Sequence, residues 1–472
     1  MPDSRSRPLW TAAEIAAAMG GVLSGPDVAV TALTYNSREI APGDLFLALK
    51  GARDGHEFAA AAFQAGAALA LVERPVEGGP FVQVSDTLKA LEALGAGARD
   101  RSPGVKRGAV TGSVGKTSVT QAIRAGLDLA GRAHGSIKSY NNHIGVPLTL
   151  ARMGQEVERA VFEIGMNAPG EIAPLSRMVR PHAACVTTVG PVHIEAFADG
   201  EAGVAREKAA IFDGLVEGGV AVANGDVPQA SVLAEHARAV GARLATFGAN
   251  GAHDARLLDF QPDAEGARVS TELHGRRMDY RLAQSGAHWG LNSLAVILML
   301  EALDVPLDTA LEALAGFQPL AGRGRVRTVD APGGAFTLID ESYNANPLSM
   351  AAGFRTLGTR PAEGRRIVVL TDMLELGEQS RSLHEGLSEA IDAAGLDMVH
   401  AAGPQMRWLY DALPTSRRGV WRESAAELAA EAALLAGLVG STHCAVMCGG
   451  IATGFSAVSS RQSWGSALQL NL

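Results

Sequence analysis

The sequence predicts an α/β protein of three domains, and two observations lead to this fold class. The chain has 472 residues, which is more than one hydrophobic core usually serves, so two to four domains are expected. Along most of its length, short apolar runs alternate with helix-length segments. This order is typical of parallel sheets that helices cover on both faces.

The first unit, residues 1–106, is expected to be a small α/β domain. It opens with an alanine-rich amphipathic segment that predicts a helix. Strand-like runs such as DLFLAL and ALALV follow, and Gly and Pro turns separate them.

The pattern changes at Arg107, where apolar strand, glycine turn and helix follow one another. AVTGSVGKTSVTQAIRAGL is the clearest such unit, and RAVFEIGM, HAACVTTVG and GVAVAN are further strand-like runs. Residues 107–321 are therefore expected to form a central domain with a mostly parallel sheet. The stretch FQPLAGRGRVRTV is typical of a linker, and it leads into a third, Rossmann-like α/β unit over residues 322–472.

Charge and cysteine content exclude some classes of partner and compartment. The formal net charge of −9 argues against nucleic acid and anionic membranes, because such partners need clustered Lys and Arg. Three cysteines are too few for a disulfide framework and suit the reducing cytoplasm. The N-terminus lacks the continuous apolar core of a signal peptide, so we expect a cytoplasmic protein.

The end of the chain departs from this composition. Ala432 to Ser460 contains no Asp, Glu, Lys or Arg, and this stretch is long enough to span a bilayer. Its His443, Cys444 and Cys448 form a candidate soft-metal site, although packed thiols are the commoner use of such residues.

A phosphate-binding loop is the clearest motif. TGSVGKTS at Thr111–Ser118 lies between an apolar run and a predicted helix. Its glycines allow backbone N–H groups to surround phosphate oxygens, while Lys116 supplies a cation and Thr117 a hydroxyl for Mg²⁺. The general motif has a further glycine where this chain has Val110, so an ordinary glycine turn before a helix stays open as the alternative.

Two other residues, Glu163 and His193, are candidate metal ligands because of their positions. Glu163 lies within the apolar run AVFEIGM, where a charge is costly unless it meets a metal or a cation. His193 follows a strand and a Gly-Pro turn, at the sheet edge where α/β proteins bind ligands. A buried salt bridge for Glu163, a solvent-facing loop position for His193 and a surface helix position for Lys208 remain the simpler interpretations.

Eight strings, in order along the chain, resemble the Mur ligase family, which builds the peptide of bacterial cell-wall precursors. They are TYNSREIAPGDLFLALKGARDGHEF, TGSVGKTS, NNHIGVPLTL, FEIGMNAPGEI, VGPVHIEAF, GAHWGLNSLAV, DESYNANPLSM and TDMLELGE followed by His384. The resemblance covers roughly residues 8–430. It is greatest to members that join D-alanyl-D-alanine to UDP-N-acetylmuramoyl-tripeptide.

The resemblance implies a site for ATP and two Mg²⁺ ions. The implied cradle for the ATP phosphates consists of Gly112, Ser113, Gly115, Lys116 and Thr117. Thr117 and Glu163 would hold one ion, and His193 would hold the second with Lys208, which is typically carbamylated in this family. The implied contacts with the rest of the nucleotide are Asn292 in the central domain and Arg323, Asp340, Tyr343, Asn344 and Asn346 in the third.

The resemblance also implies the substrates and the chemistry. Ser37 and Arg38 in the first domain would bind the uridine diphosphate of the sugar substrate. A carboxylate would be activated as an acyl phosphate and then joined to the amine of D-alanyl-D-alanine, with Lys116, Glu163, His193 and Lys208 as the catalytic set. A hinge at Gly322–Arg325 would let the third domain close, and a monomer is expected.

Three departures from the family pattern leave alternatives open. Asn36 stands where an Asp is common, and Thr371 replaces a frequent glycine. After about Ala433 the expected strand, Lys-Gly-Ser turn and closing helix are absent, and GSTHCAVMCGG instead resembles the opening membrane segment of sulfite-exporter and heavy-metal transport proteins. A precursor-binding protein with impaired catalysis is therefore one alternative. A sister ligase that adds a single amino acid is another, although such ligases usually carry a different string where this chain has DESYNANP.

Overall fold

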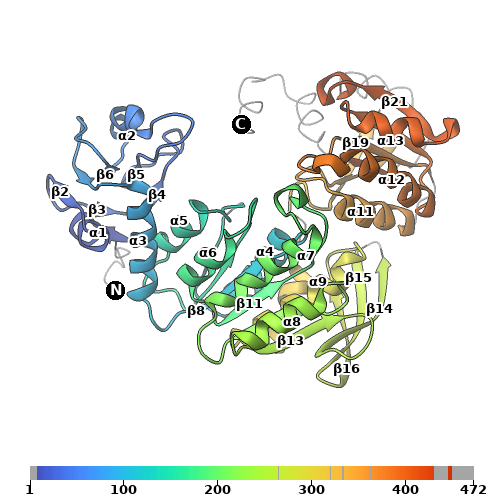
Figure 1. The fold of residues 1–472 in the computed structure, drawn as a ribbon, viewed down its shortest axis with the longest axis horizontal. Coiled ribbons are helices and arrows are strands. Elements are labelled where there is room, and N and C mark those ends of the chain that lie inside the picture. Colours follow the sequence, from blue (N-terminus) through green and yellow to red (C-terminus); the bar gives the residue numbers. More distant parts are fainter. Residues whose placement is uncertain are drawn as a thin grey trace.

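The computed structural model describes residues 8–137, 139–263, 265–318, 320–331, 334–360, 364–429 and 445–448. Three large sheets, of five, nine and six strands, divide this part of the chain into three α/β domains in sequence order. The first and third domains lie at opposite ends of the molecule, with the central domain between them (Figure 1). This architecture confirms the predicted fold class.

The N-terminal domain contains a five-stranded sheet in the order β2-β7-β6-β5-β4. The strands are β2 (Val22–Ser24), β4 (Ala32–Thr34), β5 (Asp44–Leu47), β6 (Leu69–Val72) and β7 (Phe81–Gln83), beside a two-stranded pair, β1 (Trp10–Thr11) and β3 (Ala29–Val30). The helices are α1 (Ala12–Met19), α2 (Ala59–Gln64) and α3 (Thr87–Asp100). Helix α1 starts where Thr11 accepts a hydrogen bond from the backbone N–H of Glu14, whose carboxylate caps Thr11 in return.

The central domain contains a nine-stranded sheet in the order β16-β15-β14-β13-β12-β11-β8-β10-β9. From β9 at one edge across to β14, each strand is parallel to its neighbours in the sheet. Strands β15 and β16 then pair antiparallel and form the other edge. The strands are β8 (Lys106–Thr111), β9 (Ala133–Gly135), β10 (Arg159–Glu163), β11 (Ala183–Val186), β12 (Val220–Asn224), β13 (Arg243–Gly248), β14 (Ala255–Asp263), β15 (Gly266–Leu273) and β16 (Arg276–Leu282).

Helices cover both faces of the central sheet, each over its own apolar core. On one face lie α4 (Lys116–Ala130), α9 (His288–Ala302) and α10 (Leu307–Gly316). On the other lie α5 (Gly145–Ala151), α6 (Ile172–Val179), α7 (Glu201–Ala209) and α8 (Ala230–Ala239). Because the inner strands are buried on both sides, they are continuous apolar runs such as Val220–Asn224.

The C-terminal domain has a six-stranded sheet in the order β17-β18-β22-β19-β20-β21. The strands are β17 (Arg325–Ala331), β18 (Gly334–Asp340), β19 (Arg366–Thr371), β20 (Met398–Ala402), β21 (Arg418–Arg422) and β22 (Ala445–Cys448). The helices are α11 (Pro347–Thr359), α12 (Ser380–Ala393) and α13 (Met406–Ala412). Strands β18, β22, β19, β20 and β21 pair in parallel, and β17 adds an antiparallel edge beside β18. A mostly parallel sheet is typical of a Rossmann-like domain.

Strand β22 corrects one expectation from the sequence. The third domain was expected to lack its last strand, but Ala445–Cys448 lies parallel between β18 and β19. An inner strand of a parallel sheet needs only a short apolar run, and the sequence AVMC supplies one. The alternative of impaired catalysis depended on the missing strand, so that argument is removed.

Among the described residues, no helix combines the length and the apolar character needed to cross a membrane. The uncharged stretch from Ala432 to Ser460, with the candidate ligands His443 and Cys444, lies outside the described residues except for 445–448.

Candidate active site

The phosphate loop connects the end of β8 to the start of α4, as the sequence predicts. Gly112 and Gly115 both have positive φ, at 149° and 86°. A Cβ on Gly112 would lie 1.9 Å from Oγ1 of Thr187, so only glycine fits there. Lys116 begins helix α4 and its Nζ donates to the carbonyl of Gly112 at 2.7 Å, which holds the ammonium over the loop.

The segment after β11 braces this loop. Oγ1 of Thr187 donates to the carbonyl of Val114 at 2.6 Å. Oγ of Ser113 donates to the carbonyl of Gly190 at 3.1 Å and accepts from its N–H at 3.0 Å. The backbone of the loop is therefore fixed before any phosphate binds.

Glu163 ends β10 beside the phosphate loop, and its side chain is held in one orientation. Its Oε1 accepts a hydrogen bond from Nδ2 of Asn141 at 2.7 Å, and its N–H donates to Oγ of Ser136 at 3.0 Å. Glu163 is only 1% exposed, and its Oε2 has no hydrogen-bond partner among the described residues. A buried carboxylate oxygen without a partner is costly, so this atom is available to a cation.

Lys208 and His193 lie close to Lys116. Lys208 is 2% exposed on helix α7, and burial, followed by repulsion from Lys116, holds its pKa well below the usual value. Burial also lowers the pKa of His193, and the charges of Lys116 and Lys208 act in the same direction against the opposing charge of Glu375. The structure thus brings these three predicted residues to one place.

Groups of both the central and the C-terminal domain affect the pKa of Lys116 in the phosphate loop. Burial lowers the pKa of Lys116, the carboxylate of Glu163 opposes that shift, and Arg323 of the C-terminal domain adds to it. The guanidinium of Arg323 lies 4.1 Å from the centre of the Tyr343 ring, and the Tyr343 hydroxyl lies 2.5 Å from Oγ of Ser139. The third domain therefore reaches the phosphate loop and the segment beside it.

The other residues expected to contact the nucleotide differ in their surroundings. Oδ1 of Asn292 on helix α9 lies 3.3 Å from the position of a Cβ on Gly115, so this side chain adjoins the phosphate loop. Asn344 is exposed. The oxygens of Asp340 accept from the N–H groups of Gly322 and Ser342 and from the Ser342 hydroxyl, while Asn346 caps helix α11. Asp340 and Asn346 thus have structural partners already.

The first domain carries its predicted site residues separately from the phosphate loop. Ser37 and Arg38 follow β4, and Oδ1 of Asn36 accepts from the Arg38 N–H at 3.1 Å. The amide oxygen of Asn36 thus makes the turn contact that an Asp would make at this position.

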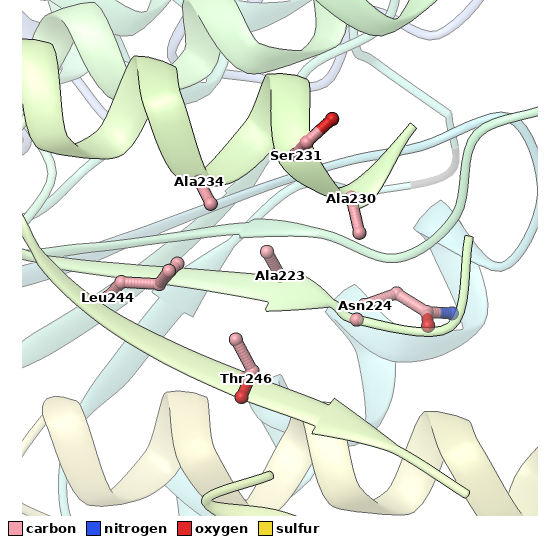
Figure 2. A pocket seen from close by; sticks show the side chains of 8 residues that line it. Ala223, Asn224, Ala230, Ser231, Ala234, Leu244 and Thr246 are labelled. Carbon is pink, nitrogen blue, oxygen red and sulfur yellow. The ribbon is translucent and has the colours of Figure 1, made fainter. Parts of the chain in front are cut away.

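A cavity of about 250 Å³ lies elsewhere in the central domain. Figure 2 shows it between helix α8, which carries Ala230, Ser231 and Ala234, and the strands that carry Ala223 and Thr246. No charged side chain lines it, so it lacks the groups that phosphate chemistry requires.

The sequence did not assign a role to three residues that the structure places at the site. Asn141 orients Glu163, Thr187 braces the phosphate loop, and Glu375 contacts His193. Asn141 and Glu375 fall within strings typical of the Mur ligases, NNHIGVPLTL and TDMLELGE. Their contacts join distant parts of the chain, which spacing alone does not predict.

The residues present suit a magnesium site of mixed ligands. Among the described residues, no three His, Cys, Asp or Glu side chains converge on one point. The predicted ligand set needs only one such side chain for each ion. Glu163 would act with the Thr117 hydroxyl at one ion, and His193 with a modified Lys208 at the other. The unpaired Oε2 of Glu163 is the observation that fits a bound cation.

Matches to known families agree with this three-domain, phosphate-loop architecture. Residues 29–99 match the Mur ligase family catalytic domain, 110–300 the Mur ligase middle domain and 324–449 the Mur ligase glutamate ligase domain. Residues 432–472 match the transmembrane region of cytochrome c biogenesis proteins, and this match overlaps the end of the third domain. The chain belongs to the Mur ligase family.

Individual relatives and solved structures show which members of the family this chain is similar to. UDP-N-acetylmuramoyl-tripeptide--D-alanyl-D-alanine ligase of Escherichia coli is 35% identical over 403 residues, which cover 84% of this chain and 86% of the relative. A crystal structure of MurF from Acinetobacter baumannii has a TM-score of 0.83 at 27% identity, covering 94% of this chain and 96% of that one. MurF ligase of Thermotoga maritima, solved in complex with ADP, shares the fold with a TM-score of 0.74 at 24% identity, covering 89% and 94%.

Proposed function

We propose that this protein joins D-alanyl-D-alanine to UDP-N-acetylmuramoyl-tripeptide in an ATP-dependent reaction that passes through an acyl phosphate. The product is the pentapeptide precursor of peptidoglycan. The relative of that name from Escherichia coli supports this reaction, since the two chains match over most of their lengths.

The observation that carries the proposal is the grouping of Lys116, Glu163, His193 and Lys208 around the phosphate loop. Two of the four, Glu163 and Lys208, are almost completely buried. Oε2 of Glu163 makes no hydrogen bond with a described residue. Buried polar groups without partners are rare, and they are typical of sites that a ligand completes.

Thr117 and Glu163 are the proposed ligands of one Mg²⁺, and His193 and Lys208 of the second. Bound Mg²⁺ would neutralise charge on the ATP phosphates and hold the reacting groups in line. A protonated lysine repels a metal, so Lys208 is proposed to act as its carbamate, which is an anionic oxygen ligand. The low pKa of Lys208 supports this modification, because only an unprotonated amine adds to CO₂.

Carbamylation has a direct test. Protein equilibrated with ¹³C-labelled bicarbonate is expected to show a carbamate carbon signal by NMR that is absent from Lys208→Met. The surface variant Lys89→Met is the control and is expected to keep the signal. If the Lys208→Met spectrum retains it, the modified residue is another lysine.

In the activation step, an oxygen of the tripeptide's terminal carboxylate bonds to the γ-phosphorus, and the bond from that phosphorus to the bridging oxygen of ADP breaks. Lys116 leaves the Gly112 carbonyl to pair with the phosphate oxygens, while the braced loop backbone surrounds them. In the second step the amine nitrogen of D-alanyl-D-alanine bonds to the acyl carbon. Phosphate leaves and the nitrogen loses a proton.

Acyl phosphates hydrolyse readily, so water must be excluded between the two steps. The proposed closure brings the third domain over the phosphate loop, about a hinge at Gly322–Arg325. Gly322 and Gly324 both have positive φ, at 71° and 86°, which suits a segment that changes direction sharply.

Ser37 and Arg38 are proposed to hold the uridine diphosphate end of the substrate in the first domain. The extended precursor would then reach from that domain to the phosphate loop. A monomer in the cytoplasm is proposed, in keeping with the buried free thiol of Cys185.

The proposal is tested by measuring phosphate release from ATP by the purified full chain. Mg²⁺, the UDP-linked tripeptide and a panel of amine acceptors are supplied. Release is expected to depend on both the tripeptide and D-alanyl-D-alanine, and single amino acids should be poor acceptors. Preference for a single amino acid would identify a sister ligase instead.

A further inference from the structure

One contact joins the central and C-terminal domains at the proposed reaction centre. Nδ1 of His193 lies 2.6 Å from Oε2 of Glu375, and the two side chains are 21% and 57% exposed. His193 follows the end of β11 in the central domain, whereas Glu375 follows the end of β19 in the C-terminal domain. Neither the family matches nor the predicted site assigns a role to Glu375.

The loop that carries Glu375 is fixed at several points. The carboxylate of Asp372 accepts from the N–H groups of Gln405 and Met406. Nε2 of the buried His384 accepts from the Met373 N–H at 3.1 Å. The side chain of Glu375 therefore projects from an anchored loop.

The backbone at the contact is strained on both sides. His193 and Glu375 have φ of 56° and 60°, in the left-handed region that costs a non-glycine residue about 1–2 kcal/mol. Gly377 lies against Glu195, where an added Cβ would be 3.0 Å from the Glu195 Cβ. Two strained residues that face each other indicate a geometry that the docked domains impose.

We propose that Glu375 is a positioning residue that orients His193 for metal binding, and this rests on the proposed function. A carboxylate oxygen only accepts, so its position 2.6 Å from Nδ1 of His193 favours a hydrogen on Nδ1, which in the neutral ring leaves the lone pair on Nε2. Nε2 makes no hydrogen bond with any described residue. Metal-binding histidines typically donate their second nitrogen to a carboxylate in this way, which fixes the tautomer and the ring.

Because Glu375 belongs to the C-terminal domain, its contact with His193 forms only when that domain is docked on the central domain. Glu375 therefore orients His193 only in the closed enzyme, and the second metal site has its full set of oriented ligands only there. Domain closure and binding of the second ion are then coupled, and the acyl phosphate forms only where water is already excluded.

The test measures Mn²⁺ binding to the full chain by electron paramagnetic resonance, with a non-hydrolysable ATP analogue present. Glu375→Ala is expected to weaken the weaker of two Mn²⁺ sites about 10–100-fold, the range for loss of an orienting partner. Glu375→Gln should recover much of the affinity, because its amide oxygen still accepts from Nδ1. Glu378→Ala removes an exposed charge from the same loop and should bind Mn²⁺ like the unaltered protein.

Three results would overturn the proposal. Unchanged Mn²⁺ affinity in Glu375→Ala, with only a raised KM for D-alanyl-D-alanine, would mean that the carboxylate holds the acceptor amine. Equal losses in Glu375→Ala and Glu375→Gln would exclude an orienting hydrogen bond. If His193→Ala keeps both ions at full affinity, the metal assignment under the proposed function fails, and the role of Glu375 fails with it.

Discussion

The two halves of the proposed reaction centre differ in the burial and bracing of their side chains. In the central domain Glu163 and Lys208 are 1% and 2% exposed, and the phosphate loop is braced by Thr187 and Ser113. In the C-terminal domain Tyr343 and Glu375 are 54% and 57% exposed and reach across to the central domain. The first half is arranged before substrate binds, and the second half completes it on docking.

This difference indicates separate roles for the two domains: the central domain stabilises charge, and the C-terminal domain opens and closes the site. Electrostatic stabilisation of a transferring phosphoryl group depends on charges that do not need to reorganise, and a buried, braced half supplies them. An exposed half can open to admit the substrates and release the products. Variants in the central half are therefore expected to lower turnover far more than matched variants in the closing half.

The largest effect is expected for Lys116→Ala. Loss of its ammonium removes the mobile cation from the phosphate loop, so kcat should fall at least 10²–10³-fold, roughly the effect of deleting one preorganised group. Tyr343→Phe, in the closing half, loses only the hydroxyl contact with Ser139 and should lower kcat about 2–10-fold. Steady-state kinetics compares the two, with melting curves to show that both variants fold. Similar decreases in kcat for both variants would contradict the proposed difference between the two halves.

Asn141→Ala is the next largest expected effect. Without the Asn141 amide, Oε1 of Glu163 loses its partner and the carboxylate is free to turn. The Mg²⁺ concentration for half-maximal activity should rise about 10–100-fold, with a smaller change in kcat at saturating Mg²⁺. The exposed Asn167, on the segment after Glu163, provides the control variant Asn167→Ala. An unaltered Mg²⁺ dependence in Asn141→Ala would show that Glu163 needs no such support.

Thr187→Val tests the brace of the phosphate loop through stability. The substitution keeps the shape of the side chain but leaves the Val114 carbonyl without its donor, which should cost about 1–3 kcal/mol in the free energy of unfolding. Thr188→Val is a matched control, since that hydroxyl makes only a 3.5 Å contact with the Val189 carbonyl. Denaturant unfolding measures both variants. Equal stability would mean that the remaining contacts, including those of Ser113 with Gly190, hold the loop without the Thr187 hydroxyl.

The smallest effect concerns Glu341, beside Arg323 in the closing half. Burial, with repulsion from Asp340, raises the pKa of Glu341 to about 7 from an ordinary value of 4.5. The folded state thus binds this proton more tightly, and stability falls as pH rises from 4.5 to 7. Glu341→Gln should raise Tm at pH 8 by about 2–4 °C, for a gain on the order of 1 kcal/mol, and change little at pH 4.5. A gain of equal size at both pH values would exclude titration as its cause.

The sequence predicted the elements of this fold better than the contacts between them. Alternating apolar runs and glycine turns predicted the parallel sheets, because local patterning specifies strands and helices. The hydrogen bond from Asn141 to Glu163 and the pair of His193 with Glu375 depend on side chains that folding brings together. Strand β22 was missed because its sequence departs from the family, whereas its place in the sheet requires only apolar character.

Asp340 and Asn346 also make contacts within the protein that the sequence did not predict. Both lie in the DESYNANP string, and both were predicted to contact the nucleotide. In the folded protein Asp340 holds the turn at Gly322, and Asn346 starts helix α11. These hydrogen bonds shape the loop, and the nucleotide contacts of both residues stay a prediction; the string alone does not show which role each residue has.

Anomalous diffraction from crystals grown with Mn²⁺ and a non-hydrolysable ATP analogue tests the central claim most directly. Two Mn²⁺ peaks are predicted, one bonded to Thr117 and Oε2 of Glu163 and the other to Nε2 of His193 and an oxygen of carbamylated Lys208. Peaks remote from these side chains, or density for an unmodified Lys208 turned away from the ions, would contradict the account.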